Sequence, residues 1–247
     1  MGKIIAVVSG KGGTGKTSFT ANVGLALAAL GCHTLCLDCD ITLRNLDLAL
    51  GLSDRALMDF TDVIAGRCTL EDAVVQHPKY PKLHLLTAPL SARPMPIAPE
   101  QMKALLDRIR QTYDYCLIDA PAGLGMGFHL ASDYADRAVV VTNTDASSLR
   151  DAQRTVMELD RLGRGNLHLV VGRVEKKLLR SLHTTIDDAM DAAGLPLLGW
   201  YRGPEVPYAL NTGSPLAGVQ QLRRKGLREY CTAHHGAAYP PDAYLNP

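Results

Sequence analysis

The sequence predicts an α/β protein with a doubly wound, mostly parallel sheet flanked by helices. Short apolar segments alternate along the chain with stretches that carry a helical pattern. Several of the apolar segments are nearly continuous in hydrophobic residues, which is typical of strands covered on both faces. Repeated strand–helix–strand units favour a parallel sheet, because parallel strands need a crossover connection.

Each expected element follows from this alternation, in chain order. The expected strands are Lys3–Ser9, His33–Asp38, Leu83–Thr87, Tyr115–Asp119, Arg137–Thr142, Leu167–Arg173 and Leu195–Trp200. The expected helices are Lys16–Leu30, Pro99–Thr112, Ser147–Leu162 and Leu178–Ala193. The Pro-rich run from Ser91 to Pro99 is expected to be a loop. Because no internal linker or repeat stands out, we expect one domain over residues 1–233 and a loosely held tail over 234–247.

The composition excludes several classes of function. The 247 residues are 47% hydrophobic and 21% charged, which is typical of a soluble globular protein with a core of its own. Lys+Arg 26 against Asp+Glu 25 leaves a net charge of +1, so a general affinity for nucleic acid is not expected. Aromatic residues make up 5%, which argues against a single-strand binder that stacks bases.

The cysteine pattern favours reduced thiols in a cytoplasmic protein. No secretory signal precedes the first strand, and no apolar run approaches the roughly 20 residues that span a bilayer. Cys36 and Cys39 have redox or metal spacing, but no second pair or His cluster accompanies them. A pleated strand would also point residues three apart toward opposite faces.

The first expected strand leads into Gly-Lys-Gly-Gly-Thr-Gly-Lys-Thr, which fits the phosphate-binding loop G-x-x-x-x-G-K-[ST]. Glycines let backbone N–H groups turn toward phosphate oxygens, and the following helix adds its positive N-terminal end. Lys16 is expected to reach the β- and γ-phosphates, and the Thr17 hydroxyl to ligate Mg²⁺. The expected nucleotide-binding residues are Gly10, Lys11, Gly12, Gly13, Thr14, Gly15, Lys16, Thr17 and Ser18.

Carboxylates follow two of the other expected strands. Asp38 and Asp40 come at the end of the second, where a metal or an attacking water would lie beside a phosphate loop. Asp119 ends an apolar strand, the arrangement that holds Mg²⁺ through water in P-loop enzymes. Taken alone, the first pair also fits a charged surface loop, and a strand ending in Asp is common.

Three motifs carry a resemblance to the MinD/ParA family of P-loop ATPases. The loop from Lys11 to Thr17 resembles the deviant phosphate loop of that family, although Thr14 stands where Val or Ile is usual. The run from Asp38 to Leu48 is similar to the family's first switch, D-x-D-x-x-x-R-N-L-D, in its MinD form. Asp-Ala-Pro-Ala-Gly, which begins at Asp119, resembles the second switch. The resemblance extends over residues 1–233.

This resemblance implies a Mg²⁺-dependent ATPase that acts as a switch and positions the division site. It implies catalytic roles for Lys11, Lys16 and Asp40: Lys11 reaches the nucleotide of a second subunit, and Asp40 orients the attacking water. It also implies Mg²⁺ contacts, partly through water, from Thr17, Asp38 and Asp119, with Asp38 coupling the nucleotide to the switch. The implied cofactors are ATP and Mg²⁺.

The implied partners are a second copy of the chain, held by ATP, and a regulatory protein of the MinC or MinE kind. The protein is expected in the cytoplasm, or at the inner face of the membrane, without nucleic acid. The family's C-terminal amphipathic helix is not visible, since the last expected helix, near 215–231, precedes a Tyr-Pro-Pro tail. Ser147–Asp151 fits a capped helix start, and is similar to a segment near the family's partner-binding surface.

Other departures leave alternatives open. After the sixth expected strand, where the family often has an Asn for base contact, the chain reads Val-Val-Gly-Arg at 170–173, and Trp200–Glu205 replaces the family's Pro-Glu-Asp loop. A ParA- or FlhG-like ATPase that positions DNA or flagella is one rival. A cluster carrier of the nitrogenase iron-protein type is another, but it needs a cysteine pair shared across a dimer, and neither Cys116 nor Cys231 suits that role. Asp40 and Asp119 together argue against a binding module without activity.

Overall fold

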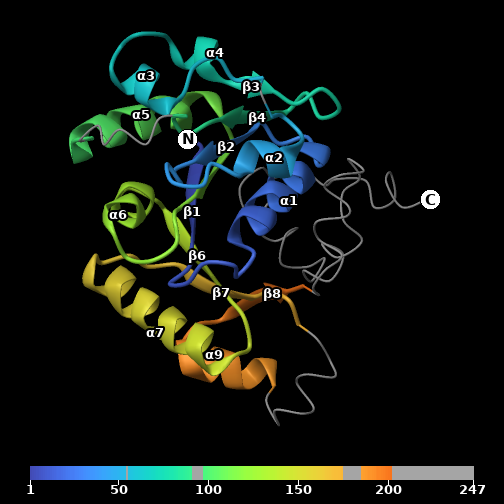
Figure 1. The fold of residues 1–247 in the computed structure, drawn as a ribbon, viewed down its shortest axis with the longest axis vertical. Helices are drawn as coiled ribbons and strands as arrows, with labels where there is room; N and C mark the ends of the chain where they lie inside the picture. Colours follow the sequence, from blue (N-terminus) through green and yellow to red (C-terminus); the bar gives the residue numbers. More distant parts are fainter. Residues whose placement is uncertain (54, 91–96, 175–184, 202–247) are drawn as a thin grey trace.

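The computed structural model describes residues 1–53, 55–90, 97–174 and 185–201. Within them lies one eight-stranded sheet in the order β3-β4-β2-β5-β1-β6-β7-β8 (Figure 1). Its neighbouring strands pair in parallel, apart from the antiparallel edge pair β3–β4. The strands are β1 (Lys3–Val8), β2 (Thr34–Asp38), β3 (Val75–Gln76), β4 (Leu83–Leu86), β5 (Tyr115–Asp119), β6 (Arg137–Thr142), β7 (Leu167–Val171) and β8 (Leu197–Trp200). The predicted fold class is confirmed.

Helices cover both faces of the sheet, as its fully buried central strands require. The helices are α1 (Lys16–Ala29), α2 (Leu46–Leu50), α3 (Phe60–Ile64), α4 (Leu70–Ala73), α5 (Pro99–Thr112), α6 (Met126–Ser132), α7 (Ala146–Arg161) and α9 (Ile186–Ala193). Buried side chains of α1 and α2 belong to one apolar core, and those of the other six belong to a second core. Figure 1 shows the same division, with α1 and α2 across the sheet from α5, α6 and α7.

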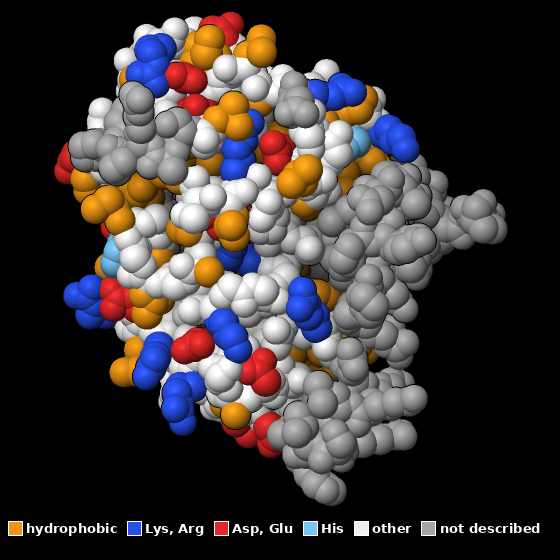
Figure 2. Space-filling view, viewed as in Figure 1, with side chains coloured by type: hydrophobic (Ala, Val, Ile, Leu, Met, Phe, Trp, Pro, Cys, Tyr) orange, Lys and Arg blue, Asp and Glu red, His pale blue; other side chains and the backbone are white. Residues whose placement is uncertain are grey.

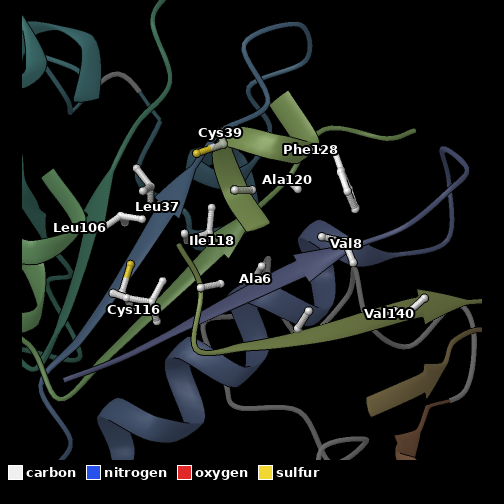
Figure 3. Close-up of a cluster of buried hydrophobic side chains, with 14 of the residues drawn as sticks. Ala6, Val8, Leu37, Cys39, Leu106, Cys116, Ile118, Ala120, Phe128 and Val140 are labelled. Carbon is white, nitrogen blue, oxygen red and sulfur yellow. The ribbon is translucent and has the colours of Figure 1, made fainter. Parts of the chain in front are cut away.

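The larger core fills the space between the sheet and α3 to α9. Figure 3 shows how Ala6 and Val8 of β1, Ile118 of β5 and Val140 of β6 point to the same side of the sheet. Phe128 of α6 closes over them and is fully buried. Alternate residues of the same strands face α1, so each strand contributes to both cores.

Three cysteines in or directly after β2 and β5 are buried in the two apolar cores. Cys36 lies in the core under α1, whereas Cys39 lies in the core on the opposite face, as the pleat predicts. Cys116 of β5 is 1% exposed in the larger core (Figure 3). A thiol at this depth cannot be shared with a second chain, which agrees with the expectation that Cys116 does not suit a cluster carrier. Cys231 lies outside the residues that the structure describes.

The seven predicted strands are present, with small shifts at their ends. β5 and β6 have the predicted bounds, while β7 ends at Val171 rather than Arg173 and β8 begins at Leu197 rather than Leu195. β3 was not predicted, because two residues carry no detectable alternation.

Four predicted helices are found, of which α5 has the predicted bounds. α7 begins one residue earlier than predicted, because Asp145 is its N-cap and accepts a hydrogen bond from the Ser148 N–H. The last predicted helix begins later than predicted, at Ile186 rather than Leu178, because Thr185 is its N-cap and accepts a hydrogen bond from the Asp188 N–H. The short helices α2, α3, α4 and α6 were not predicted. The loop at 91–96, the helix near 215–231 and the tail over 234–247 fall outside the described ranges, so the domain boundary stays a prediction.

The face shown in Figure 2 carries Lys and Arg side chains interspersed with Asp and Glu side chains. The two signs are mixed over that face, in keeping with the net charge of +1. No helix in the described ranges is long and apolar enough to cross a membrane.

The strand order places the predicted site. β2, β5 and β1 are neighbours in the sheet, and all three are parallel. Their carboxyl ends therefore lie side by side at one edge, together with the loops that follow them. The phosphate loop follows β1, the switch carboxylates follow β2, and Asp119 ends β5.

Candidate nucleotide-binding site

The loop between β1 and α1 forms one wall of a cavity of about 300 Å³ at the carboxyl edge of the sheet. Gly13 and Gly15 have φ angles of 77° and 91°, a left-handed conformation that other residues adopt at a cost. Gly15 is also the N-cap of α1, so the positive end of a 14-residue helix opens at the loop. The cavity is lined by Ser9, Lys11, Gly12, Gly13, Thr14, Gly15, Lys16, Thr17, Ser18, Asp40, Leu43, Asn45, Ala122 and Arg173.

A buried polar network connects the start of α1 to the end of β5. The Lys16 ammonium group donates to Oδ1 of Asp119 at 3.2 Å, and the Thr17 hydroxyl donates to Oδ2 at 2.6 Å. Thr20 is one turn further along α1, and its hydroxyl lies 3.5 Å from Oδ1 of the same carboxylate. A cation, two hydroxyls and a carboxylate are therefore gathered directly behind the phosphate loop.

Two buried carboxylates lie on adjacent strands in this region. Asp38 and Asp119 are register partners of β2 and β5, and neither is more than 1% exposed. Burial, followed by the negative charge of Asp119, raises the pKa of Asp38 to about 7. Burial likewise raises the pKa of Asp119, although the Lys16 ammonium opposes that shift. Such mutual repulsion favours a cation at this point, because a cation stabilises both ionised carboxylates.

The carboxylates that follow β2 organise the first switch loop. Asp38 accepts hydrogen bonds from the backbone N–H groups of Asp40 at 2.8 Å and Leu46 at 3.1 Å. Oδ1 of Asp40 accepts from the N–H groups of Thr42 and Leu43, both at 3.1 Å. Asp38 therefore ties the end of β2 to both ends of the loop, while Asp40 holds its turn and lines the cavity.

The two lysines of the phosphate loop, Lys11 and Lys16, have different partners. Its ammonium group donates to Oγ of Ser147 at 2.7 Å and lies 3.5 Å from Oδ1 of Asp145, both at the start of α7. The Lys11 side chain is 45% exposed. The structure thus places one lysine, Lys16, inside the site and the other, Lys11, at its rim.

The donors around the cavity fit a nucleotide phosphate with Mg²⁺. A Cβ added at Gly12 or Gly13 would meet nothing within 4 Å, so the loop backbone is open on that side. The Thr14 hydroxyl is buried and has no hydrogen-bond partner within the described part of the chain. An ammonium, a helix N-terminus and N–H groups suit phosphate oxygens, while Thr17 and the buried carboxylates are the oxygen ligands that Mg²⁺ prefers.

Of the predicted site residues, 11–18 and Asp40 line one cavity, whereas Gly10, Asp38 and Asp119 are not part of its lining. Asp119 is joined to the site by the hydrogen bonds from Lys16 and Thr17, and the role of each residue stays a prediction. Two further residues belong to the site but were not identified by the sequence motifs. Arg173 lines the cavity from the end of β7 with a φ of 52°, and the Tyr201 hydroxyl contacts the phosphate loop from beyond β8. No local pattern in the sequence marks either residue as part of the site.

Comparisons with known proteins agree with this geometry. A family model described as an AAA domain matches residues 2–169. The chain is 38% identical over 229 residues to the septum site-determining protein MinD of Synechocystis, covering 92% of this chain and 86% of that protein.

Two solved structures are similar to this chain in both fold and sequence. The MinC:MinD cell division protein complex of Aquifex aeolicus superposes with a TM-score of 0.83 at 33% identity, over 98% of this chain and 99% of that one. The septum site-determining protein MinD of Pyrococcus horikoshii, complexed with Mg-ADP, gives a TM-score of 0.83 at 30% identity, over 97% of this chain and 100% of that one.

Proposed function

The chain belongs to the MinD family of P-loop ATPases, and we propose that ATP switches it between a monomer and a face-to-face dimer. It is an ATPase with ATP and Mg²⁺ as cofactors, and a cell division regulator of the MinD type. We propose below the role that individual residues have in this switch.

One observation carries the proposal: the buried Lys16–Asp119–Thr17 network lies behind a glycine loop, and Asp40 lines the same cavity. Lys16 exchanges its contact with Asp119 for the β- and γ-phosphate oxygens, where its charge is needed as negative charge develops. Mg²⁺, when bound, would neutralise part of the phosphate charge. Thr17 would hold that ion directly, and Asp119 and Asp38 would hold it in part through water.

Asp40 is the residue we propose to orient the attacking water. Its Oδ1 already accepts two backbone hydrogen bonds from the switch loop, so the carboxylate is fixed in direction. Rigid placement of the water is worth more to catalysis than basicity in phosphoryl transfer, where positioning supplies much of the rate. The same two hydrogen bonds connect the state of the site to the conformation of the loop.

Lys11 is the residue we propose to join two subunits. Its ammonium group lies at the rim, on Ser147 and Asp145, where a second copy facing the site can be reached. Closure of the dimer would move each Lys11 from this contact to the nucleotide of the other subunit. Hydrolysis then removes the charge that Lys11 binds, and the dimer separates.

We further propose that the ATP-bound dimer works with a regulatory protein of the MinC kind at the inner face of the membrane. The Asp40→Ala protein with ATP should be sedimented with anionic liposomes and, separately, with plasmid DNA. ATP-dependent sedimentation with liposomes supports this function. Sedimentation with plasmid supports a DNA-positioning ATPase instead, and sedimentation with neither contradicts the membrane location.

A further inference from the structure

Tyr201 follows β8 and reaches back across the sheet to the phosphate loop. Its hydroxyl donates a hydrogen bond to the backbone carbonyl of Thr14 at 3.0 Å, and the contact is buried. Only 7% of Tyr201 is exposed. A side chain from the far end of the described chain is thus in direct contact with the middle of the loop.

The backbone of Tyr201 is fixed from both sides. Its N–H donates to the carbonyl of Val171 at 3.1 Å, and its carbonyl accepts from the N–H of Val174 at 3.0 Å. Val171 is the last residue of β7 and Val174 follows it by three positions, and β7 is paired through β6 to the strand that carries the loop. The Tyr201 hydroxyl is therefore a rigid anchor relative to the sheet.

The anchored carbonyl determines where the next N–H points. The described chain contains no cis peptide bond, and in a trans peptide the C=O and the following N–H point in opposite directions. A hydrogen bond that holds the Thr14 carbonyl toward Tyr201 consequently turns the Gly15 N–H away from Tyr201. Backbone N–H groups that face the ligand are what make such a loop bind phosphate.

Two glycines provide the space for this hydroxyl. A Cβ at Gly15 would lie 2.2 Å from the Tyr201 oxygen, and a Cβ at Gly172 would lie 2.5 Å from it and 2.8 Å from the Thr14 carbonyl oxygen. Gly172 does not have a positive φ, so the close approach of Tyr201 is the reason for a glycine there. Burial also raises the pKa of Tyr201, which keeps the hydroxyl protonated as a donor.

We propose that Tyr201 is a positioning residue for phosphate binding: its hydroxyl holds the Thr14 carbonyl outward and so orients the Gly15 N–H toward the phosphates. Gly172 is part of the same arrangement, because it leaves room for the Tyr201 hydroxyl. The inference rests on the proposed function, in which the loop binds nucleotide phosphates.

The test is Tyr201→Phe, which removes only the hydroxyl. The matched control is Tyr113→Phe, a 5% exposed tyrosine at the C-cap of α5. MgADP and magnesium tripolyphosphate are titrated calorimetrically into each protein, and the melting temperature is measured without ligand. We expect Tyr201→Phe to bind both probes about three- to tenfold more weakly, the value of one neutral hydrogen bond, and Tyr113→Phe to bind as the wild type.

The steady-state kinetics give a second readout. Because the Gly15 N–H contact is present both before and during the reaction, Tyr201→Phe should raise KM by the same factor and leave kcat within about twofold. Gly172→Ala, which displaces the hydroxyl without removing it, should reproduce the loss of affinity.

Two results would overturn the proposal. The first is unchanged affinity of Tyr201→Phe for both probes, which together with a lower melting temperature would make Tyr201 merely structural. The second is a loss for MgADP but not for tripolyphosphate, which would place the effect at the base. If the wild type binds neither probe, the proposed phosphate site itself is wrong.

Discussion

The ammonium nitrogen of Lys16 lies 3.2 Å from Oδ1 of Asp119, and the two side chains are 8% and 1% exposed. Each charge compensates the other in a region shielded from water. Either charge alone would be expensive to bury. Removing one member of the pair should therefore destabilise the fold, because the other charge stays buried without a partner.

Lys16→Ala should lower the melting temperature of the ligand-free protein by roughly 5–10 °C, because Asp119 is left buried without its cation. Adding Asp119→Asn should recover much of that loss, since the unpaired charge is then removed. Thermal unfolding of the wild type, both single variants and the double variant measures this coupling. Additive effects of the two substitutions would show that the pair does not interact.

Gly15→Ala should reduce the free energy of unfolding by about 2–4 kcal/mol. The reasons are the left-handed backbone at a φ of 91° and a Cβ placed 2.2 Å from the Tyr201 oxygen. Gly12→Ala is the matched control, because its Cβ meets nothing within 4 Å and its φ is not positive. Urea titrations compare the two. Equal destabilisation would contradict the specific role of Gly15.

Lys11→Ala should bind ATP within about threefold of the wild type, yet fail to form the ATP-dependent dimer. Its ammonium group contacts Ser147 and Asp145 at the rim of the cavity, so we expect a single chain not to need it to hold phosphate. Nucleotide titration and light scattering on the same sample separate the two effects. An undiminished dimer would refute the role of Lys11 across the interface.

His84→Phe should make stability less sensitive to acid. Burial, and then the neighbouring His33, lower the pKa of His84 below 6.5. The unfolded chain therefore binds a proton more readily, so this contribution to stability is complete above about pH 6.5 and is lost as the pH falls below it. The Phe variant should lose less stability than the wild type between pH 8 and pH 5.5, measured by thermal unfolding. A parallel pH profile would contradict this account.

The phosphate loop, Asp40 and Asp119 could be predicted from the sequence because each is specified locally. A glycine pattern, or a carboxylate at the end of an apolar strand, sits within a few residues of the strand that positions it. The parallel order of β2, β5 and β1 then brings these local signals together. The helices α5 and α7 could be predicted for the same reason, since 14 and 16 residues show a helical period clearly.

Contacts between distant residues could not be predicted in this way. Tyr201 and Thr14 are 187 positions apart, and no motif announces their hydrogen bond. The contact of Lys11 with Ser147 spans 136 positions and depends on where α7 begins. Helices such as α2 and α3 have five residues each, which is too short for a period, and their packing and caps determine them instead.

In the proposed switch, ATP holds two chains together until Asp40 supports hydrolysis. Asp40→Asn keeps an oxygen that can accept the Thr42 and Leu43 hydrogen bonds, whereas Asp40→Ala removes it. The Asn variant therefore separates loss of catalysis from loss of the switch turn.

The most direct measurement is light scattering of Asp40→Ala and Asp40→Asn with Mg²⁺ and ATP, beside phosphate release from the same samples. We predict a stable species of twice the 26.6 kDa chain mass for both variants, with phosphate release reduced at least tenfold. A monomer in the presence of ATP, or phosphate release at the wild-type rate, would contradict the account.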